Sequence, residues 1–210
     1  MDLSRVAAHR PVRVRDQERD AAVLVPVVDG ASDEDGRFEA DDSDREPALV
    51  FTKRADHLGE HPGQMSFPGG GREPSDGDLR DTAVREVDEE IGLRRDEISF
   101  VGQLDDIATV TSYSVTPFVG RVPDRSYVPD EREVDEVVVL PISGLTDPAN
   151  YELEKRVHPK YGEALVHFFH VHGYTVWGAT GRILLQFLDL AVDWTPPDRD
   201  PEVVEMDPDA

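Results

Sequence analysis

The sequence contains no cysteine, and it has only three lysines among its 210 residues. The lack of cysteine excludes a disulfide framework and any metal site with thiolate ligands. Long apolar runs are missing as well, because the longest, residues 21–28 and 137–142, are far too short to cross a bilayer. Residues 1–20 mix charges of both signs and lack the apolar core of a signal peptide. We therefore expect a cytoplasmic protein that does not bind a membrane.

Positive charge is scarce relative to negative charge. Asp and Glu number 45 against 22 Lys and Arg, which gives a formal net charge of −23 at pH 7. A field of this sign argues against binding to nucleic acid, which requires Lys and Arg to displace counterions from the backbone. We hypothesise adaptation to the salty cytoplasm of a halophile, where self-repulsion is screened and hydrated carboxylates maintain solubility. The alternative is an ordinary acidic protein, but the excess of arginine over lysine favours the first interpretation.

The length and the order of apolar segments predict one domain over residues 1–210. We expect its core in about residues 20–192, an acidic loop at 29–46 and a disordered tail at 193–210. Short β-branched runs and two helical patterns predict the α+β class. The expected architecture is a mixed β-sheet flanked by helices, an α/β/α sandwich.

Capping residues and proline set limits on the expected elements. One helix should begin near residues 75–78, where N-cap residue types cluster, and end at Gly92. A second helix is expected at residues 179–192. Residues 21–28 read as a strand, and Pro26 predicts an edge or bulged position for it because proline cannot donate to a ladder.

A glycine-rich turn, residues 69–71, precedes the first of these helices, which carries Glu86, Glu89 and Glu90. Residues three and four apart lie on one face of a helix, so the three carboxylates should cluster there. Like charges repel unless something positive lies among them. An oxygen-seeking divalent cation such as Mg²⁺ fits this arrangement, because it prefers carboxylate and water ligands.

Residues 71–93 resemble the Nudix box, the signature of the Nudix hydrolase superfamily. That pattern is a glycine, five residues, a glutamate, seven residues, and then Arg-Glu-apolar-any-Glu-Glu-any-Gly-apolar. Residues 85–93 match its second half at every position. The first acid of the pattern differs, since counting from the opening glycine leads to Gly77. Either Asp76 or Glu73 would take that role.

A stretch upstream of the box is more specific. Residues 49–70, LVFTKRADHLGEHPGQMSFPGG, look like the additional signature of the coenzyme A diphosphatase branch of this superfamily. Residues 112–120, 133–137 and 174–180 also resemble that branch, so the likeness spans about residues 20–190. It implies a metal-dependent hydrolase that splits coenzyme A, or its derivatives, into 4′-phosphopantetheine and adenosine 3′,5′-bisphosphate.

The resemblance also implies roles for individual residues. Glu86, Glu89 and Glu90 would be the ligands of Mg²⁺ or Mn²⁺, and Arg85 would hold Glu89 in place. The base that takes the proton of the attacking water would be Glu89 or Glu136. Substrate contacts are expected from local positive charge, from the glycine turn and from the upstream signature: Lys53, Arg54, His61, Gln64, Gly69, Gly70 and Arg72.

The expected partner is a small-molecule nucleotide of the coenzyme A class. If the protein forms a homodimer, a second copy of the chain is a partner as well. A Nudix pyrophosphatase for ADP-ribose or a dinucleotide is the nearest alternative, because no single residue selects coenzyme A. A Nudix-fold binding module without activity is less favoured, since such modules typically lose box glutamates. For the substrate-contact residues, simpler roles in ion pairs and loop hydrogen bonds remain open.

Overall fold

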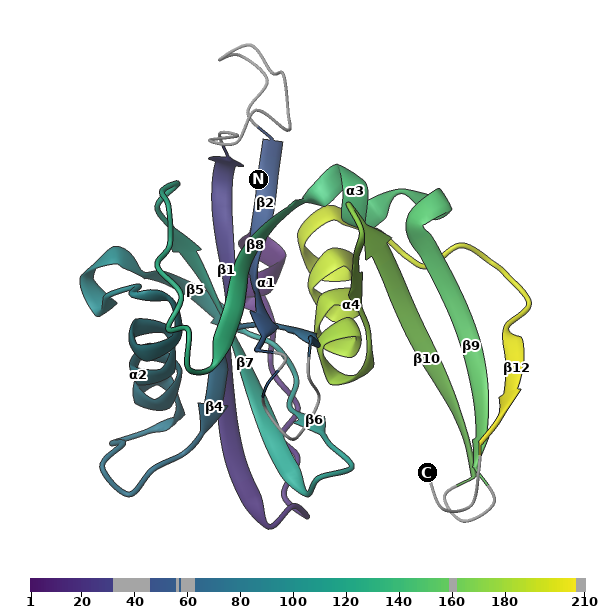
Figure 1. Cartoon of the computed structure of the whole chain (residues 1–210), viewed down its shortest axis with the longest axis horizontal. Coiled ribbons are helices and arrows are strands. Elements are labelled where there is room, and N and C mark those ends of the chain that lie inside the picture. Colours follow the sequence, from purple (N-terminus) through teal and green to yellow (C-terminus); the bar gives the residue numbers. More distant parts are fainter. Residues whose placement is uncertain (32–45, 56, 58–62, 159–161, 207–210) are drawn as a thin grey trace.

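The structure, a computed structural model, contains an eight-stranded sheet and a four-stranded sheet. Figure 1 shows helix α2 (Leu79–Ile91) on one side of the large sheet and helix α4 (Gly178–Val192) on the other, with the second sheet beyond α4. The predicted α+β class, with a mixed sheet flanked by helices, is confirmed. The described part of the chain comprises residues 1–31, 46–55, 57, 63–158 and 162–206.

Eight strands make up the large sheet: β1 (Arg19–Ala31), β2 (Glu46–Arg54), β3 (Met65–Ser66), β4 (Gly69–Gly71), β5 (Ser99–Gln103), β6 (Ile107–Ala108), β7 (Tyr113–Val122) and β8 (Val134–Pro141). At its centre β1 and β7 run parallel. The other pairings, of β2 and β4 with β1, of β5 and β6 with β7, and of β3 and β8 with β2, are antiparallel. The sheet is therefore mixed.

Pro26 lies in neither of the two predicted positions, because β1 is not an edge strand and its register shift against β2 comes later in the strand. β1 has β7 on one side and both β4 and β2 on the other. On that second side it pairs with β4 through residues 21–23 and with β2 from Val27 onward, so Pro26 falls between the two partners. Leu24, two residues earlier, directs its N–H to the carbonyl of Pro68 on this side. Proline costs the sheet little here because no ladder partner faces its missing N–H.

Both predicted helices form with the expected ends. The side chain of Asp78 accepts a hydrogen bond from the N–H of Asp81 at 2.9 Å and caps α2, and Gly92 ends the helix at φ 64°. Among the described residues, no helix combines the length and the apolar character needed to span a bilayer. Four short helical segments complete the helical structure: α1 (Ser4–Ala8), η1 (Arg95–Glu97), α3 (Ile142–Thr146) and η2 (Pro148–Asn150).

Each face of the large sheet is covered by its own hydrophobic cluster. On one face, Val87 and Ile91 of α2 pack against the sheet. On the other face, Phe51 of β2 belongs to the same cluster as Phe187 of α4 and Phe169 of the second sheet. Alternating residues of a strand point to opposite faces, so the longer strands β1, β2 and β7 contribute to both clusters. The second cluster therefore includes residues from both sheets and from α4.

The second sheet consists of β9 (Tyr151–His158), β10 (Gly162–Val171), β11 (Tyr174–Val176) and β12 (Glu202–Glu205). The prediction of a disordered tail from residue 193 is wrong for its described part, because β12 pairs with β9. Trp194 donates to the carbonyl of Thr146 at 2.9 Å, and Arg199 donates to the carbonyl of Tyr151 at 2.7 Å. Contacts with distant residues thus order a segment whose composition favours disorder.

The predicted acidic loop at 29–46 is too long at both ends. β1 continues to Ala31, and β2 begins at Glu46. The carboxylate of Glu46 accepts hydrogen bonds from the N–H and the hydroxyl of Ser143, at 2.7 Å and 2.8 Å. Residues 32–45 of that loop lie outside the described part of the chain.

Candidate active site

A turn of glycines leads into α2 and lies against its glutamates. Gly69 has a φ of 153°, and a Cβ atom there would lie 2.3 Å from the carbonyl oxygen of Ala22. A Cβ atom at Gly70 would lie 2.4 Å from Oε1 of Glu86. The N–H of Gly69 donates to Oε2 of Glu90 at 3.0 Å. The glycines are therefore required because the backbone passes so close to β1 and to two carboxylates.

Arg85 connects the helix to the turn before it. Its Nη1 lies 3.0 Å from Oε1 of Glu86 and 3.0 Å from Oε2 of Glu89. Its Nη2 donates to the carbonyl of Gly71 at 2.9 Å, and its Nε donates to Oδ1 of Asp76 at 3.0 Å. The predicted contact between Arg85 and Glu89 is present, and Arg85 also fixes the position of the glycine turn.

Asp76, rather than Glu73, occupies the place of the first acid of the box. Its side chain is 4% exposed, and it accepts hydrogen bonds from Arg85, from the hydroxyl of Thr82 at 2.9 Å and from the N–H of Glu73 at 2.8 Å. The Arg85 guanidinium holds the pKa of Asp76 well below its usual range. The carboxylate of Glu73 instead accepts from the hydroxyl of Ser75 at 3.3 Å.

Burial disfavours negative charge on two glutamates of α2. It raises the pKa of Glu86 and outweighs the ion pair with Arg85. Burial also raises the pKa of Glu90 to about 8, although the hydrogen bond from Gly69 lowers it. The negative charges of Glu86 and Glu133 raise this pKa as well. Neighbouring carboxylates that are partly buried and short of positive charge suit a hard divalent cation. These residues therefore fit Mg²⁺ or Mn²⁺.

The three box glutamates do not form a complete cage by themselves. Glu86 is 13% exposed and faces the glycine turn, whereas the side chain of Glu89 is 59% exposed and extends to Arg85. Within the described ranges, no three His, Asp or Glu side chains are gathered closely enough to hold a metal ion. The fit to a cation therefore depends on Glu86 and Glu90, and waters and substrate oxygens would have to supply the remaining ligands.

The three cations predicted to contact the substrate lie in different surroundings. Arg54 alternates along β2 with Val50, which belongs to the hydrophobic cluster on the α2 face, so it lies on the α2 side of the sheet. Lys53, the preceding residue, pairs with Asp135, the Nζ to Oδ2 distance being 2.8 Å. Arg72 donates to a backbone carbonyl of the turn before α2 at 3.3 Å. The structure thus places Arg54 on the side of the sheet that carries the glutamates and assigns Arg72 to the turn itself.

Glu136 is separated from the glutamates of α2, contrary to its expected role as a base. It alternates along β8 with Val138, which belongs to the cluster on the α4 face of the sheet. Its Oε1 accepts a hydrogen bond from the hydroxyl of Tyr174 at 2.8 Å. Glu133, just before β8, is the acid whose charge reaches Glu86 and Glu90. Spacing along the strand could not decide between them, because a β-bulge opposite residues 53 and 54 shifts the register here.

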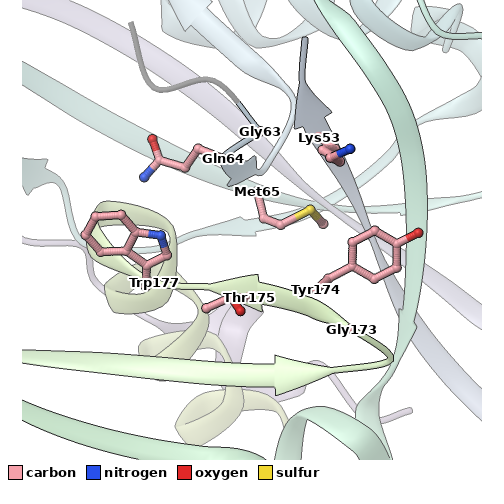
Figure 2. Close-up of a pocket in the computed structure, with 8 residues that line it drawn as sticks. All are labelled: Lys53, Gly63, Gln64, Met65, Gly173, Tyr174, Thr175 and Trp177. Carbon is pink, nitrogen blue, oxygen red and sulfur yellow. The ribbon is translucent and has the colours of Figure 1, made fainter. Parts of the chain in front are cut away.

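Gln64 lines a cavity of about 320 Å³ between β3 and β11. Figure 2 shows its side chain together with Trp177 and Thr175 around this space. Residues 174–180, which include Thr175 and Trp177, are one of the stretches that resemble the coenzyme A diphosphatase branch. His61, from the same signature as Gln64, lies outside the described residues.

The pattern that describes the NUDIX domain matches residues 38–161 of the chain. Curated relatives carry the name "Uncharacterized Nudix hydrolase NudL". The one from Enterobacter sp. (strain 638) is 35% identical over 87% of this chain and 88% of its own length. The one from Shigella flexneri is 32% identical over 92% of this chain and 94% of its own length.

Solved structures support the fold. The MutT/nudix family protein from Enterococcus faecalis aligns over 88% of this chain and 66% of its own, with a TM-score of 0.52 and 12% identity. The NUDIX hydrolase from Nitrosomonas europaea aligns over 92% of this chain and 82% of its own, with a TM-score of 0.51 and 13% identity. The chain therefore belongs to the NUDIX domain family and is a hydrolase that acts on phosphorus-containing anhydrides.

Proposed function

We propose that this hydrolase cleaves the diphosphate bond of coenzyme A or its derivatives and releases 4′-phosphopantetheine and adenosine 3′,5′-bisphosphate. One observation supports metal-dependent cleavage of a diphosphate. Gly69 and Gly70 approach the partly buried carboxylates of Glu86 and Glu90 closely. The choice of coenzyme A depends on residues 49–70, which resemble the coenzyme A diphosphatase branch.

In this proposal Glu86, Glu89 and Glu90 hold Mg²⁺ or Mn²⁺. When bound, the cation offsets the charge that develops on the phosphate oxygens. Arg85 keeps Glu89 and the glycine turn in position, since it contacts both. The N–H of Gly69 orients the carboxylate of Glu90.

A carboxylate must take the proton of the attacking water. We propose Glu89 for this role, because its side chain is 59% exposed, the most of the three box glutamates, and only one of its oxygens is engaged by Arg85. Glu133 is a further candidate, as its charge reaches Glu86 and Glu90. Glu136, the other base expected from the sequence, is better suited to hold Tyr174 through their 2.8 Å hydrogen bond.

Positive charge near the glutamates would receive the diphosphate. Arg54 is suited to this because it lies on their side of the sheet, and a guanidinium can bind two phosphate oxygens at once. Lys53 and Gln64 would contact a more distant part of the substrate, since both line the cavity between β3 and β11. Arg72 would act indirectly by supporting the turn that it bonds.

A substrate panel tests this proposal. With Mg²⁺ present, we expect kcat/KM for coenzyme A to exceed that for ADP-ribose or a dinucleoside diphosphate by at least about tenfold, because the cavity adds contacts for the non-nucleotide part. Chelation of the metal should abolish turnover of all of them. Preference for ADP-ribose would identify a different Nudix pyrophosphatase, and the lack of any turnover would favour a binding module.

The charge of −23 also leads to a proposal, that the protein is adapted to high salt. Screening reduces repulsion between carboxylates, so the melting temperature should rise from low to molar KCl. Differential scanning fluorimetry over this range measures the effect. A melting temperature that stays constant with salt would contradict a halophilic origin.

Two further features are proposed along with this function, a cytoplasmic location and a homodimer. Leu165 and Val203 of the second sheet are 54% and 60% exposed, which supports a contact between two copies. Light scattering should then give twice the 23.4 kDa of one chain. A mass of 23.4 kDa over micromolar concentrations would exclude the dimer.

A further inference from the structure

The cavity between β3 and β11 has walls from two distant parts of the chain. Gln64 and Met65 come from the segment that leads into β3, whereas Thr175 and Trp177 come from the end of the second sheet. The second group lies outside residues 38–161, which match the NUDIX domain. This wall therefore combines a segment inside the matched range with a segment beyond it, and segments of this kind that connect regular elements often carry substrate contacts.

Gln64 and Trp177 each direct a polar side-chain group to this cavity. In the part of the chain that the structure describes, neither the side-chain amide of Gln64 nor the indole N–H of Trp177 makes a hydrogen bond. Nε2 of Gln64 lies near the backbone of Gly178, since a Cβ atom added there would come within 3.7 Å of it. Figure 2 shows the nitrogen-bearing edge of Trp177 directed toward the other lining residues. The cavity thus offers both hydrogen-bond donors and an acceptor to a ligand.

The ring of Trp177 is already packed against the protein. It stacks on Phe168 with ring centroids 5.7 Å apart and an angle of 12° between the planes. The guanidinium of Arg156 lies over the same indole, 5.1 Å from its centroid. Trp177 thus presents mainly the edge of its ring, which carries the N–H, to the cavity. A flat base would need an open aromatic face for stacking, whereas a chain with carbonyl groups needs a donor such as this one.

The cavity is connected to the candidate catalytic site through β2. Lys53 lines the cavity, and Arg54, the next residue, lies on the opposite face of the sheet, which is the face covered by α2. Tyr174 also lines the cavity, and its hydroxyl bonds Glu136, the residue opposite Lys53 in the ladder. A substrate held at Arg54 by its diphosphate could therefore pass the end of β2 and extend into the cavity.

We infer that this cavity binds an uncharged, flexible chain that carries amide groups and is attached to the diphosphate of the substrate. The proposal rests on the proposed function, in which this chain is the pantetheine arm of coenzyme A. Its amides would pair with Gln64 and Trp177, and its methylene groups would lie against Met65. The volume of about 320 Å³ is within the range of small-molecule sites.

Replacing Trp177 with phenylalanine tests the inference by kinetics. W177F keeps an aromatic ring for stacking on Phe168 but removes the N–H. We expect KM for coenzyme A to rise about three- to tenfold with kcat unchanged, because the lost bond is present in ground and transition states alike. Hydrolysis of ADP-ribose, which has no such arm, should keep its KM. The control is E202A, at an exposed position of the same sheet, with both substrates unaffected.

An unchanged KM for coenzyme A in W177F would overturn the inference. So would an equal loss with ADP-ribose, since that would indicate a general effect on the site. Circular dichroism and the melting temperature of W177F would confirm that the variant is folded. Q64A provides a second test, as it should raise KM for coenzyme A in the same selective way.

A binding measurement separates this inference from the proposed catalytic function. In a ¹H–¹⁵N spectrum, millimolar pantetheine should shift the indole signal of Trp177 in the wild-type protein. The indole signal of Trp194 serves as the internal control, because its N–H is already bonded to Thr146. If the enzyme did not hydrolyse coenzyme A but this shift occurred, the proposed function would fail and the cavity assignment would stand. No shift, or a shift caused equally by adenosine 3′,5′-bisphosphate, would overturn the cavity assignment.

Discussion

Replacing Glu90 with glutamine is expected to reduce metal-dependent hydrolysis by at least about a thousandfold, and to raise the melting temperature of the metal-free protein. Loss of a metal ligand removes several kcal/mol of transition-state stabilisation, and about 1.4 kcal/mol corresponds to tenfold in rate. In the metal-free protein, the substitution should increase the stability of the fold. Burial disfavours the charge of Glu90 and raises its pKa to about 8, and glutamine carries no charge. A neutral amide of the same shape can still accept the hydrogen bond from Gly69.

Two measurements decide this prediction, kcat/KM at saturating Mg²⁺ and the melting temperature with and without Mg²⁺. The wild-type protein should be stabilised by Mg²⁺, whereas E90Q should not respond. The matched control is D88N, which removes one charge from the solvent-exposed side of the same helix and should leave both measurements unchanged. If E90Q retained its activity, or if Mg²⁺ stabilised it as it does the wild type, the assignment of Glu90 as a ligand would be wrong.

Replacing Asp76 with alanine is expected to lower the free energy of unfolding by about 3 kcal/mol and the activity by about ten- to a hundredfold. The side chain of Asp76 is 4% exposed and accepts bonds from Arg85, Thr82 and the backbone of Glu73. Its loss leaves the Arg85 guanidinium without its main partner beside α2. Arg85 in turn holds Glu89 and Gly71, so the glycine turn should lose its orientation.

Urea unfolding and steady-state kinetics measure the two effects. E73A is the matched control, because Glu73 was the other candidate for this position and its carboxylate contacts only Ser75 among the described residues. We expect E73A to change the free energy of unfolding by less than about 0.5 kcal/mol. Comparable losses in the two variants would show that Asp76 is not the acid that pairs with Arg85 in solution.

Much of the fold near α2 could be predicted because its causes are local. The cap at Asp78 and the end at Gly92 depend on residues within one turn of the helix. The spacing of Glu86, Glu89 and Glu90 places them on one side of the helix, whatever the helix packs against. The glycines before the helix signalled a close approach of backbone, and the structure identifies Ala22 and Glu86 as the groups approached.

Predictions that depended on distant partners were less successful. Pro26 suggested an edge strand, but the gap between β4 and β2 accommodates it inside the sheet. The composition from residue 193 onward suggested disorder, yet Trp194 and Arg199 bond to Thr146 and Tyr151 and lead the chain into β12. In both cases the outcome depends on residues far away in the sequence, so a prediction from neighbouring residues could not include them.

The glycine turn, the carboxylate-bearing helix and the hydrolase family were determined by residue order alone, because helix geometry and turn conformation follow from neighbours in the chain. The tertiary structure decided which acid pairs with Arg85, which acid near β8 faces the α2 glutamates, and where Trp177 lies. A β-bulge changes the side of a strand on which a residue points, and the packing of the second sheet brings Trp177 to Gln64. Both depend on pairing between strands far apart in sequence, which only the folded chain establishes.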